Sequence, residues 1–235
     1  MCKQCDAKPV YTDISGKKLC ARHFIRFYEK KILRTIRAYE MIKTKPKKDK
    51  VLIVVREGNK NDFALLHFFH RYCQQRKINI IALFIQYSQR KDYKYIRDYC
   101  VKKKIDFAVS QSPKSIFEEK IIKKFALKLK TIIARGECLN DAAVSILNYF
   151  FNGEKEIIHP IEKKKIKIIR PLYFCKEEEN KIYCLLNKIK IPEISEIPKK
   201  EGGNKEITKK FLRDFEKTNK GILYAIVNKY EKLSL

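Results

Sequence analysis

The sequence predicts an α/β fold, a parallel sheet with helices on both faces. Short apolar runs that are rich in β-branched residues lie at positions 51–55, 78–85, 105–109 and 131–134. The segments between them repeat their apolar residues at three- and four-residue steps, as amphipathic helices do. Strands that alternate with helices build a parallel sheet, and helices cover both faces of such a sheet.

The composition is that of a folded chain with one main domain. Of 235 residues, 45% are hydrophobic, and 14 Phe and 13 Tyr supply large side chains for a core, although 34% of the residues are charged. A chain of this length buries a full core, so we expect one main domain with small additions. Disordered chains have a much lower share of aliphatic and aromatic residues.

The charge is strongly positive and predicts a polyanionic partner. There are 54 Lys and Arg against 27 Asp and Glu, a formal net charge of +27. Nucleic acid is the partner that this surplus favours, and a membrane surface is the weaker alternative. A Lys-rich composition that serves solubility and ion-pair networks is the other interpretation, but such networks need comparable numbers of acidic residues.

Nothing in the sequence predicts a membrane segment. No apolar run approaches the roughly 20 residues of a transmembrane helix, and the N-terminus MCKQCDAK has no apolar signal-peptide core. We therefore expect a cytoplasmic protein without a membrane partner. In that compartment its eight cysteines are reduced or bound to metal.

Residues 1–23 are predicted to form a zinc-binding head. Cys2, Cys5, Cys20 and His23 give the pattern C-x2-C-x14-C-x2-H, two close ligand pairs separated by a loop. Four protein ligands leave no position for water, so the pattern predicts a structural zinc ion, which would supply folding energy to a segment without a core of its own. The alternative is a set of ordinary reduced thiols in an N-terminal extension.

Residues 24–50 are predicted to form a basic helix and a linker. Apolar residues from Ile25 to Tyr39 recur at helical spacing and indicate one buried face. A second stripe at the same spacing is positively charged, and more lysines follow in the linker. The RNA contacts predicted here are Arg26, Lys30, Arg34, Arg37, Lys47 and Lys48. For any single one of them, solvated surface is the simpler interpretation.

The main α/β domain is expected over residues 51–172. Its first strand, 51–55, runs through a glycine-bearing turn into an amphipathic helix, the order of elements that holds a phosphate at a helix N-terminus. The turn reads E-G-N-K-N-D, however. Its acidic residues, Glu57 and Asp62, would repel an anion.

The rest of the chain is predicted from its glycines, prolines and apolar periodicity. A helix over 141–151 is closed by Gly153, and a basic strand that ends at Pro171 follows. This strand supplies three further predicted RNA contacts, Lys163, Lys164 and Lys165. Residues 173–235 form a C-terminal helical region with helices near 176–186, 205–217 and 222–233.

The remaining cysteines and histidines indicate no further site. Five cysteines share no ligand spacing and are interpreted as small buried hydrophobes: Cys73, Cys100, Cys138, Cys175 and Cys184. His67 and His70 are interpreted as part of a hydrated helix face. His159, which precedes Pro160, is interpreted as a loop residue.

Four stretches in a fixed order carry a resemblance to a known family. They are the metal-binding head with LCARHFIRFYEKKILRTIRAYEMI, then VLIVVREGNKNDFALL, ARGECLNDAAVSILNYFFNGE and IIRPLYFCKEEENKIYCLL. In this order they resemble the tRNA 2-thiolation proteins of the PP-loop ATP pyrophosphatase superfamily, which activate a uridine with ATP and replace its oxygen with sulfur. The resemblance runs over nearly the whole chain and implies a PP-loop-like domain over 51–172, with tRNA as the partner.

The phosphate loop departs from the family pattern. The family has S-G-G-K-D-S, of which this chain keeps Gly58 and Lys60. In the second family motif, G-H-N-L-D-D-E-A, it keeps Gly136, Leu139 and Asp141. The resemblance therefore implies Gly58, Lys60 and Asp141 as the remaining cofactor contacts, and it makes ATP a doubtful ligand.

The family's reactive cysteines are also missing. Active members carry a C-x2-C pair ahead of the third helix and a further cysteine in the C-terminal part. In this chain Ser110 and Pro113 stand where the pair is expected, and no cysteine follows Cys184. The resemblance therefore implies no catalytic residue, and it argues against an iron–sulfur cluster.

Three functions follow from these patterns. The first is a catalytically degenerate relative, a pseudoenzyme, which binds tRNA and acts as partner or scaffold subunit of a catalytic paralogue of the same fold. The eukaryotic wobble-uridine thiolase, which pairs a catalytic subunit with a degenerate homologue, is the precedent that the resemblance supplies. The second is an ATP-dependent tRNA sulfurtransferase with an atypical loop, in which Lys60 binds ATP and Asp62 or Asp141 holds magnesium. The third is a nucleic-acid-binding protein outside tRNA modification.

Overall fold

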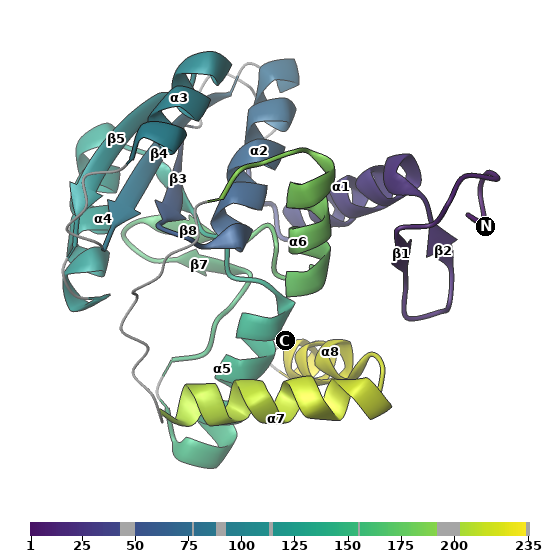
Figure 1. Cartoon of the computed structure of the whole chain (residues 1–235). Coiled ribbons are helices and arrows are strands. Elements are labelled where there is room, and N and C mark those ends of the chain that lie inside the picture. The colour runs from purple at the N-terminus through teal and green to yellow at the C-terminus, as the bar shows by residue number, and fades with distance from the viewer. Residues whose placement is uncertain are drawn as a thin grey trace.

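The computed structural model describes residues 1–42, 50–76, 78–87, 93–112, 115–154, 156–191 and 203–233. Figure 1 shows the arrangement of its elements. The strands are β1 (Tyr11–Thr12), β2 (Lys18–Leu19), β3 (Lys50–Arg56), β4 (Asn79–Gln86), β5 (Asp106–Gln111), β6 (Ile132–Ala134), β7 (Ile161–Lys163) and β8 (Lys167–Ile169). The helices are α1 (Ala21–Ala38), α2 (Lys60–Arg76), α3 (Lys94–Lys103), α4 (Ser115–Leu129), α5 (Leu139–Asn152), α6 (Glu177–Leu186), α7 (Asn204–Thr218) and α8 (Ile222–Leu233).

The main sheet confirms the predicted α/β class. Its strand order is β5-β4-β3-β6-β8-β7, and every neighbouring pair is parallel except β7 and β8. The single basic strand expected before Pro171 is in fact this antiparallel hairpin. The chain leaves β3 toward β4 and β5 and then returns to place β6 on the other side of β3. The order in which the chain adds strands therefore reverses between β3 and β6. In open α/β sheets, ligands bind at such a point, outside the carboxyl ends of the strands.

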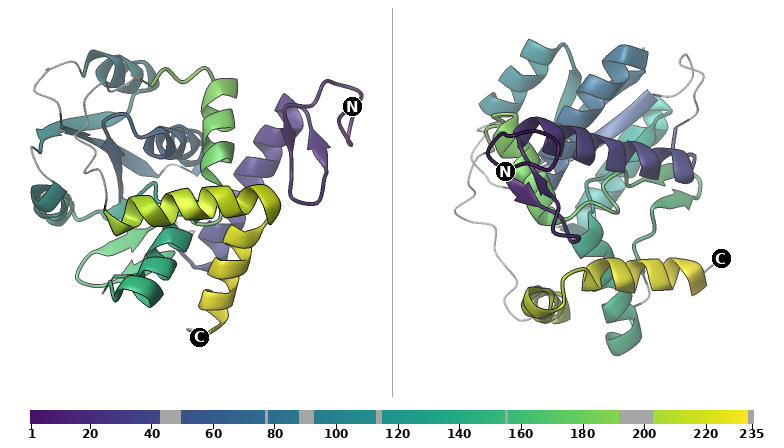
Figure 2. Two further views of the ribbon diagram at one scale, coloured as in Figure 1. Left: turned by 60° about the horizontal axis from the view of Figure 1, so that its bottom comes forward. Right: turned by 90° about the vertical axis from the view of Figure 1, so that its right-hand side faces the viewer.

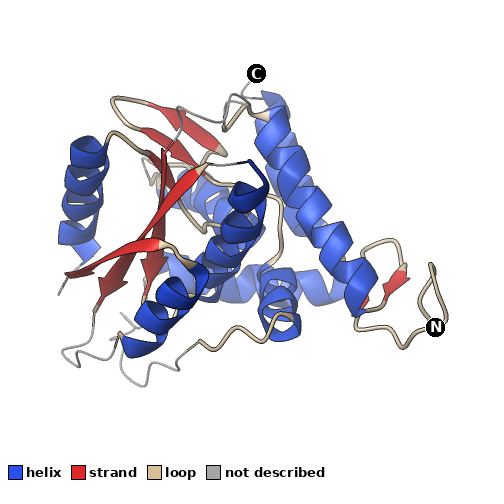
Figure 3. Ribbon diagram, turned by 90° about the horizontal axis from the view of Figure 1, so that it is seen from above, coloured by secondary structure: helices blue, strands red, loops and turns tan. Residues whose placement is uncertain are grey.

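The alternating residues of β3 bury both faces of the sheet. Val51, Ile53 and Val55 pack in the core cluster that includes residues of α1, α2, α3 and α6. Leu52 and Val54 point to the opposite face and pack with residues of α4. Figure 3 shows helices on both sides of the strands. All five residues are at most 1% exposed, as a parallel strand covered on both faces requires.

A separate cluster joins α5 to the last two helices. Leu139, Ala143, Ile146, Leu212, Leu223 and Val227 are among its buried members. Figures 1 and 2 show α7 and α8 packed against α5 beside the sheet. Gly153 ends α5 in the left-handed region at φ 64°, as its position after the apolar stripe predicts. None of the described helices is both long and apolar enough to span a membrane.

The interpretation of His67 and His70 as a hydrated face is wrong. Helix α2 is enclosed by the sheet and by α6, so the two histidines are only 8% and 6% exposed. The ring Nδ1 of His67 lies 3.1 Å from the hydroxyl of Tyr183. Burial, followed by the nearby charge of Arg71, lowers the pKa of His67 to about 4, so the ring is neutral at pH 7. The five cysteines outside the head are buried, as expected.

One buried carboxylate ties the N-terminal head to the rest of the molecule. Glu179, in the first turn of α6, accepts hydrogen bonds from the hydroxyl of Tyr11 at 2.7 Å and from the amine of Lys31 at 2.6 and 2.7 Å. It also accepts the backbone N–H of Lys176 as a helix cap. Lys31 donates in addition to the hydroxyl of Tyr224 in α8. Glu179 therefore joins β1, α1 and α6, and α8 through Lys31.

Glu179→Gln should lower the free energy of unfolding by about 3–5 kcal/mol, because it removes the charge that neutralises a largely buried Lys31. The matched control on the same helix is Glu177→Gln. Glu177 pairs with Lys181 at 3.3 Å, both side chains are about half exposed, and the loss should stay below about 1 kcal/mol. Urea unfolding measures both variants. Equal losses of unfolding free energy in the two variants would show that Glu179 contributes no more to stability than an exposed ion pair does.

Candidate functional site

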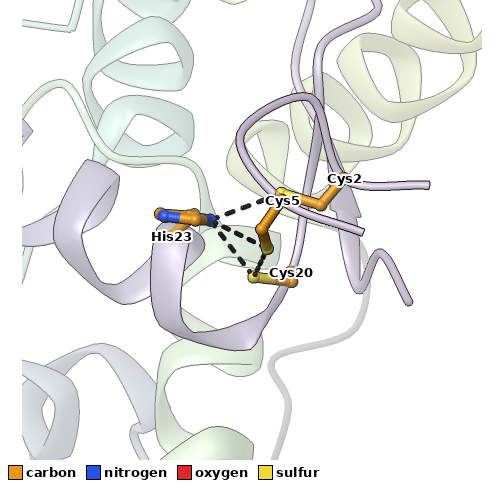
Figure 4. A group of neighbouring side chains, drawn as sticks. All are labelled: Cys2, Cys5, Cys20 and His23. Carbon is orange, nitrogen blue, oxygen red and sulfur yellow. Dashed lines mark hydrogen bonds between the residues drawn. The ribbon is translucent and has the colours of Figure 1, made fainter. Parts of the chain in front are cut away.

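The head brings the four predicted metal ligands together. Cys2 and Cys5 lie in the N-terminal loop, Cys20 precedes α1, and His23 lies in its first turn, so the start of the helix positions two of the four ligands. Figure 4 shows the three sulfur atoms on one side of His23, facing the same ring nitrogen. The ring Nδ1 lies 3.4, 3.5 and 3.3 Å from the sulfurs of Cys2, Cys5 and Cys20. The sulfurs of Cys5 and Cys20 are 3.6 Å apart.

These separations match the edges of a tetrahedron whose centre lies about 2.1–2.3 Å from each ligand atom, the bond lengths of a zinc-type ion. The donor chemistry is also that of a metal site. Burial raises the pKa of Cys2, but hydrogen bonds from the backbone of Gln4 and Cys20 and from His23 outweigh it and lower the pKa to about 6. The thiolate, which is the form that binds metal, is thus favoured at neutral pH.

The loop between β3 and α2 turns through a glycine into the start of the helix, and one of its own side chains accepts the first N–H groups of that helix. Gly58 adopts a positive φ of 68°, which a residue without Cβ adopts readily. The side-chain oxygen of Asn59 caps α2 by accepting the backbone N–H groups of Asn61 and Asp62, at 3.0 and 3.3 Å. The carboxylate of Glu57 accepts the N–H of Tyr87 at 2.8 Å.

Asp62 is fully buried and bound to Arg56. Its two oxygens accept the side-chain Nε and Nη2 of Arg56 at 2.7 and 2.9 Å, and one of them also accepts the backbone N–H of Arg56. Lys60, in contrast, begins α2 and is exposed. Of the loop residues, Lys60 is the one that presents a charge to solvent.

The phosphate-loop segment contacts the segment that contains Gly136, Cys138 and Asp141. This contact lies where the strand order reverses, between β3 and β6. A Cβ at Gly136 would lie 2.2 Å from the side-chain Oδ1 of Asp62 and 2.9 Å from its backbone nitrogen. The amide of Asn61 lies 3.5 Å from the sulfur of Cys138. Asp141 lies in the first turn of α5, where it accepts the N–H of Cys138 at 3.0 Å. It therefore serves as a helix cap.

A group of arginines at this edge was missed in the sequence. Arg56 ends β3, Arg135 follows β6 and Arg170 follows β8, and these three strands are neighbours. Because parallel strands end at the same edge, the three guanidinium groups converge, and Glu137 lies among them. The available signal was an arginine directly after each of the apolar runs VLIVV, TIIA and IKII.

Glu137 is the centre of this group. Its Oε1 lies 3.5 Å from Nη1 of Arg56 and 3.3 Å from Nε of Arg135, and its Oε2 accepts Nε of Arg170 at 3.1 Å. Burial alone would raise the pKa of Glu137, but the charges of Arg135, Arg56 and Arg170 lower it to about 2. The carboxylate is therefore ionised throughout the physiological range.

The predicted RNA contacts that the structure describes are exposed. Arg26, Lys30, Arg34 and Arg37 line the outer face of α1, while Tyr28, Ile32 and Ile36 bury the inner face. Lys163, Lys164 and Lys165 are exposed at the β7–β8 turn. Lys167 donates to the carbonyl of Glu40 at 2.9 Å, so this hairpin lies beside the end of α1. Lys47 and Lys48 lie outside the described residues.

A cavity of about 340 Å³ lies elsewhere. It is lined by Ile78, Asn79 and Asp106, at the amino ends of β4 and β5, and by Lys103 and His70 among others. The phosphate-loop segment lies at the carboxyl ends of the strands. This cavity is therefore separate from the edge where the loop and the arginines meet.

Stability should depend on pH through Glu137. Because its pKa in the folded state is about 2, below the ordinary 4.5, its stabilisation is complete above pH 4.5 and is lost as pH falls toward 2. The difference corresponds to about 3 kcal/mol. Urea unfolding over this pH range should show a weaker pH dependence in Glu137→Gln than in the native protein. Parallel curves would contradict this role, because the other carboxylates titrate in both proteins.

Comparisons with known proteins agree with the fold. No family model matches the chain. The tRNA-5-methyluridine(54) 2-sulfurtransferase of Pyrococcus horikoshii is 25% identical over 98% of this chain and 82% of that protein. The tRNA(Ile)-lysidine synthase of Clostridium tetani is 36% identical, but over only 32% of this chain and 16% of its own length.

A solved structure matches over almost the whole chain. The U34-tRNA thiolase NcsA from Methanococcus maripaludis, solved with its 4Fe–4S cluster, superposes with a TM-score of 0.82. The match covers 99% of this chain and 86% of that one at 20% identity.

This neighbour corrects the expectation on cofactors. The sequence argued against an iron–sulfur cluster, and that expectation is wrong, because NcsA, which shares the fold along the whole chain, carries one. The three thiolates of the head, Cys2, Cys5 and Cys20, are the ligand type that such clusters use. With this fold and these homologues, the chain is a relative of the tRNA 2-thiolation enzymes and has the α/β fold of the PP-loop ATP pyrophosphatases.

Proposed function

We propose that this protein binds tRNA and acts in uridine 2-thiolation as a non-catalytic partner of a catalytic paralogue with the same fold. The observation that carries the proposal is the state of the α2 N-terminus. The backbone N–H groups of Asn61 and Asp62 donate to the side chain of Asn59, and the turn and the first turn of the helix carry two carboxylates, Glu57 and Asp62. A phosphate needs free N–H groups and positive charge at this position.

The electrostatics oppose a polyphosphate there. Each carboxylate near a phosphate contributes a repulsion on the order of 1–4 kcal/mol at the dielectric of a protein surface. Arg56, which is well placed to offset this charge, is already held by both oxygens of Asp62. The loop thus keeps the turn of a nucleotide site while its charges are neutralised internally.

The cysteines outside the head also support a non-catalytic role. A sulfur carrier has to form a thiolate. Burial raises the pKa of Cys73, Cys100 and Cys184 to about 12, and it raises that of Cys138 and Cys175 as well. At neutral pH these five thiols stay protonated and enclosed. Sulfur transfer would then fall to the partner.

The RNA surface of this proposal is made by α1 and the β7–β8 hairpin. The four basic residues of α1 lie on one exposed face, and the contact between Lys167 and Glu40 places the hairpin lysines beside the end of that helix. We infer that the two groups form one basic surface. The relatives, which are named as tRNA-modifying enzymes, make tRNA the nucleic acid of choice.

tRNA binding should depend steeply on salt, because each phosphate contact releases a counterion. Arg34→Glu with Arg37→Glu should reduce the slope of log affinity against log salt by about 2, roughly one unit for each residue. Folded tRNA should also bind better than an unstructured RNA of equal length, because the surface recognises shape. Fluorescence anisotropy over a salt series measures both effects.

The matched control is Lys120→Glu with Lys124→Glu on α4. These lysines are exposed on the other face of the sheet, and their replacement changes the net charge by the same amount. This variant should keep nearly the native slope. If both pairs weaken binding equally, only total charge matters. Equal binding of tRNA and unstructured RNA would favour a nucleic-acid-binding protein outside tRNA modification.

The alternative is an ATP-dependent tRNA-modifying enzyme with an atypical loop. Gly58 keeps the positive φ of a phosphate turn, and Lys60 is exposed at the start of α2, where it can contact an anion. Asp62 or Asp141 would hold magnesium in this case. In the present arrangement both oxygens of Asp62 contact Arg56, and Asp141 caps α5.

Binding of magnesium-ATP separates the two functions. We expect millimolar ATP to leave the melting temperature unchanged, because Asn59 already accepts the N–H groups at the start of α2 and Arg56 is already held by Asp62. A ligand present at 100 times its Kd would stabilise the protein by about 2.7 kcal/mol, which thermal unfolding detects readily. A rise that Lys60→Ala removes would favour the enzyme. A rise that persists in Lys60→Ala would indicate nucleotide binding away from the loop.

A metal centre in the head completes the proposal. Cys2, Cys5, Cys20 and His23 would hold it, and the metal would stabilise a segment whose link to the core includes Tyr11 and Glu179. The donor set suits a single tetrahedral ion or an iron–sulfur cluster. The metal therefore has to be identified by measurement.

Purified protein should contain one metal centre per chain, and Cys5→Ser should lose it and lower the melting temperature. Elemental analysis distinguishes the two candidates, because zinc alone indicates a single ion and iron with acid-labile sulfide indicates a cluster. Cys73→Ser, a buried cysteine outside the head, is the control and should keep the metal. Unchanged metal content in Cys5→Ser would contradict the site.

A further inference from the structure

Three arginines at adjacent strand ends form a built site. The guanidinium groups of Arg56, Arg135 and Arg170 come from β3, β6 and β8, and their side chains are only 20%, 12% and 6% exposed. A cluster of like charges is costly to enclose unless an anion lies among them. In this protein the anion is the carboxylate of Glu137.

Each arginine is fixed from its outer side. Asp62 holds Nε and Nη2 of Arg56, as described above. Nη2 of Arg170 lies 2.6 Å from Glu162, and its Nη1 donates to the carbonyl of His159 at 2.7 Å. Arg135 pairs on its outer side with Glu119 and, at 3.6 Å, with Glu118.

The outer partners leave three nitrogens that point inward. These are Nη1 of Arg56, Nε of Arg135 and Nε of Arg170, which lie 3.5, 3.3 and 3.1 Å from the oxygens of Glu137. Because the outer contacts do not involve Glu137, they remain when Glu137 is replaced. The three nitrogens are therefore positioned in advance.

One carboxylate does not satisfy all the donors. Within the described part of the chain, Nε of Arg135 is a buried donor without a hydrogen-bond partner, although it faces Glu137. A planar carboxylate offers two oxygens in one plane, whereas phosphate and sulfate offer four in a tetrahedron. Guanidinium groups bind such oxyanions with several parallel hydrogen bonds.

We propose that Arg56, Arg135 and Arg170 form an oxyanion site that Glu137 fills as an internal anion, so that inorganic phosphate occupies the site once the carboxylate is removed. This inference rests on the proposed function and deepens it, since it explains how the edge is closed to a phosphate-bearing ligand. The site differs from the phosphate loop because its donors are side chains at three strand ends. In the native protein the outer carboxylates and Glu137 together outnumber the three arginines, so a further anion is repelled.

The experiment is thermal unfolding of Glu137→Ala in a series of sodium phosphate concentrations at constant ionic strength. In chloride the variant should melt well below the native protein. Saturating phosphate should raise its melting temperature by roughly 5 °C more than it raises that of the native protein. Phosphate stabilises many proteins without binding, so the difference between variant and native protein is the measured quantity.

Glu119→Ala is the matched control. It removes a carboxylate that pairs with Arg135 from the exposed outer side and leaves Glu137 in place. It should respond to phosphate as the native protein does. An equal gain in this variant would show that any lost carboxylate creates the effect, and it would overturn the proposal.

Glu137→Ser is the second variant. Phosphate should stabilise it in the same way, and its larger side chain leaves a smaller cavity among the arginines than alanine does. If neither variant folds at any phosphate concentration, or if phosphate adds nothing beyond its effect on the native protein, the proposal is wrong. Since the test uses neither RNA nor nucleotide, its failure leaves the proposed function standing. ATP binding by the native protein would overturn the non-catalytic role without affecting the phosphate rescue.

Discussion

The enclosure of β3 on both faces is the constraint on which the rest of the structure depends. Residues 51–55 have no contact with solvent, so the strand is tied to β4 and β6 at its sides and to helices above and below. At the carboxyl end of β3 the chain leaves the buried core. Because β6 and β8 run parallel to it, their carboxyl ends emerge at the same edge. Charged side chains placed there have to neutralise one another, and the arginines around Glu137 do so.

The fold was predictable because it depends on apolar periodicity. The runs at 51–55 and 131–134, and the stripe that became α5, bury their side chains as the sequence indicates. Helix α3 buries only Ile96 and Cys100, so the apolar periodicity that indicates it is weak. The β7–β8 hairpin was read as one strand, since strands of three residues show no period.

The candidate site was predictable only where spacing is local. The head follows from close ligand pairs, and the structure brings all four residues together. The partners of Glu137 lie up to 81 positions away in the sequence, as Arg56 does, and no local pattern connects them. The burial of His67 was missed for a related reason. The sequence pattern assigned His67 to a hydrated helix face. Its burial follows from the packing of α6 over α2, which no local pattern indicates.

Helix α1 links the head, the core and the basic surface. Its first turn carries His23, its inner face buries Tyr28 and Ile32, and Lys31 reaches Glu179. The outward stripe is therefore held rigidly, since the same helix is fixed at its start and along its length. A surface of this kind presents charges at constant spacing, which suits a folded RNA better than a flexible one.

The close approach of Gly136 to Asp62 has an evolutionary consequence. Any side chain at position 136 would collide with the carboxylate that holds Arg56, and replacing Asp62 alone would leave a buried arginine without its partner. Glu137 is bound to the same arginine. Residues 62, 136 and 137 are therefore coupled through Arg56, and a change at one of them alone should lower stability. Across related chains these three positions are expected to change together.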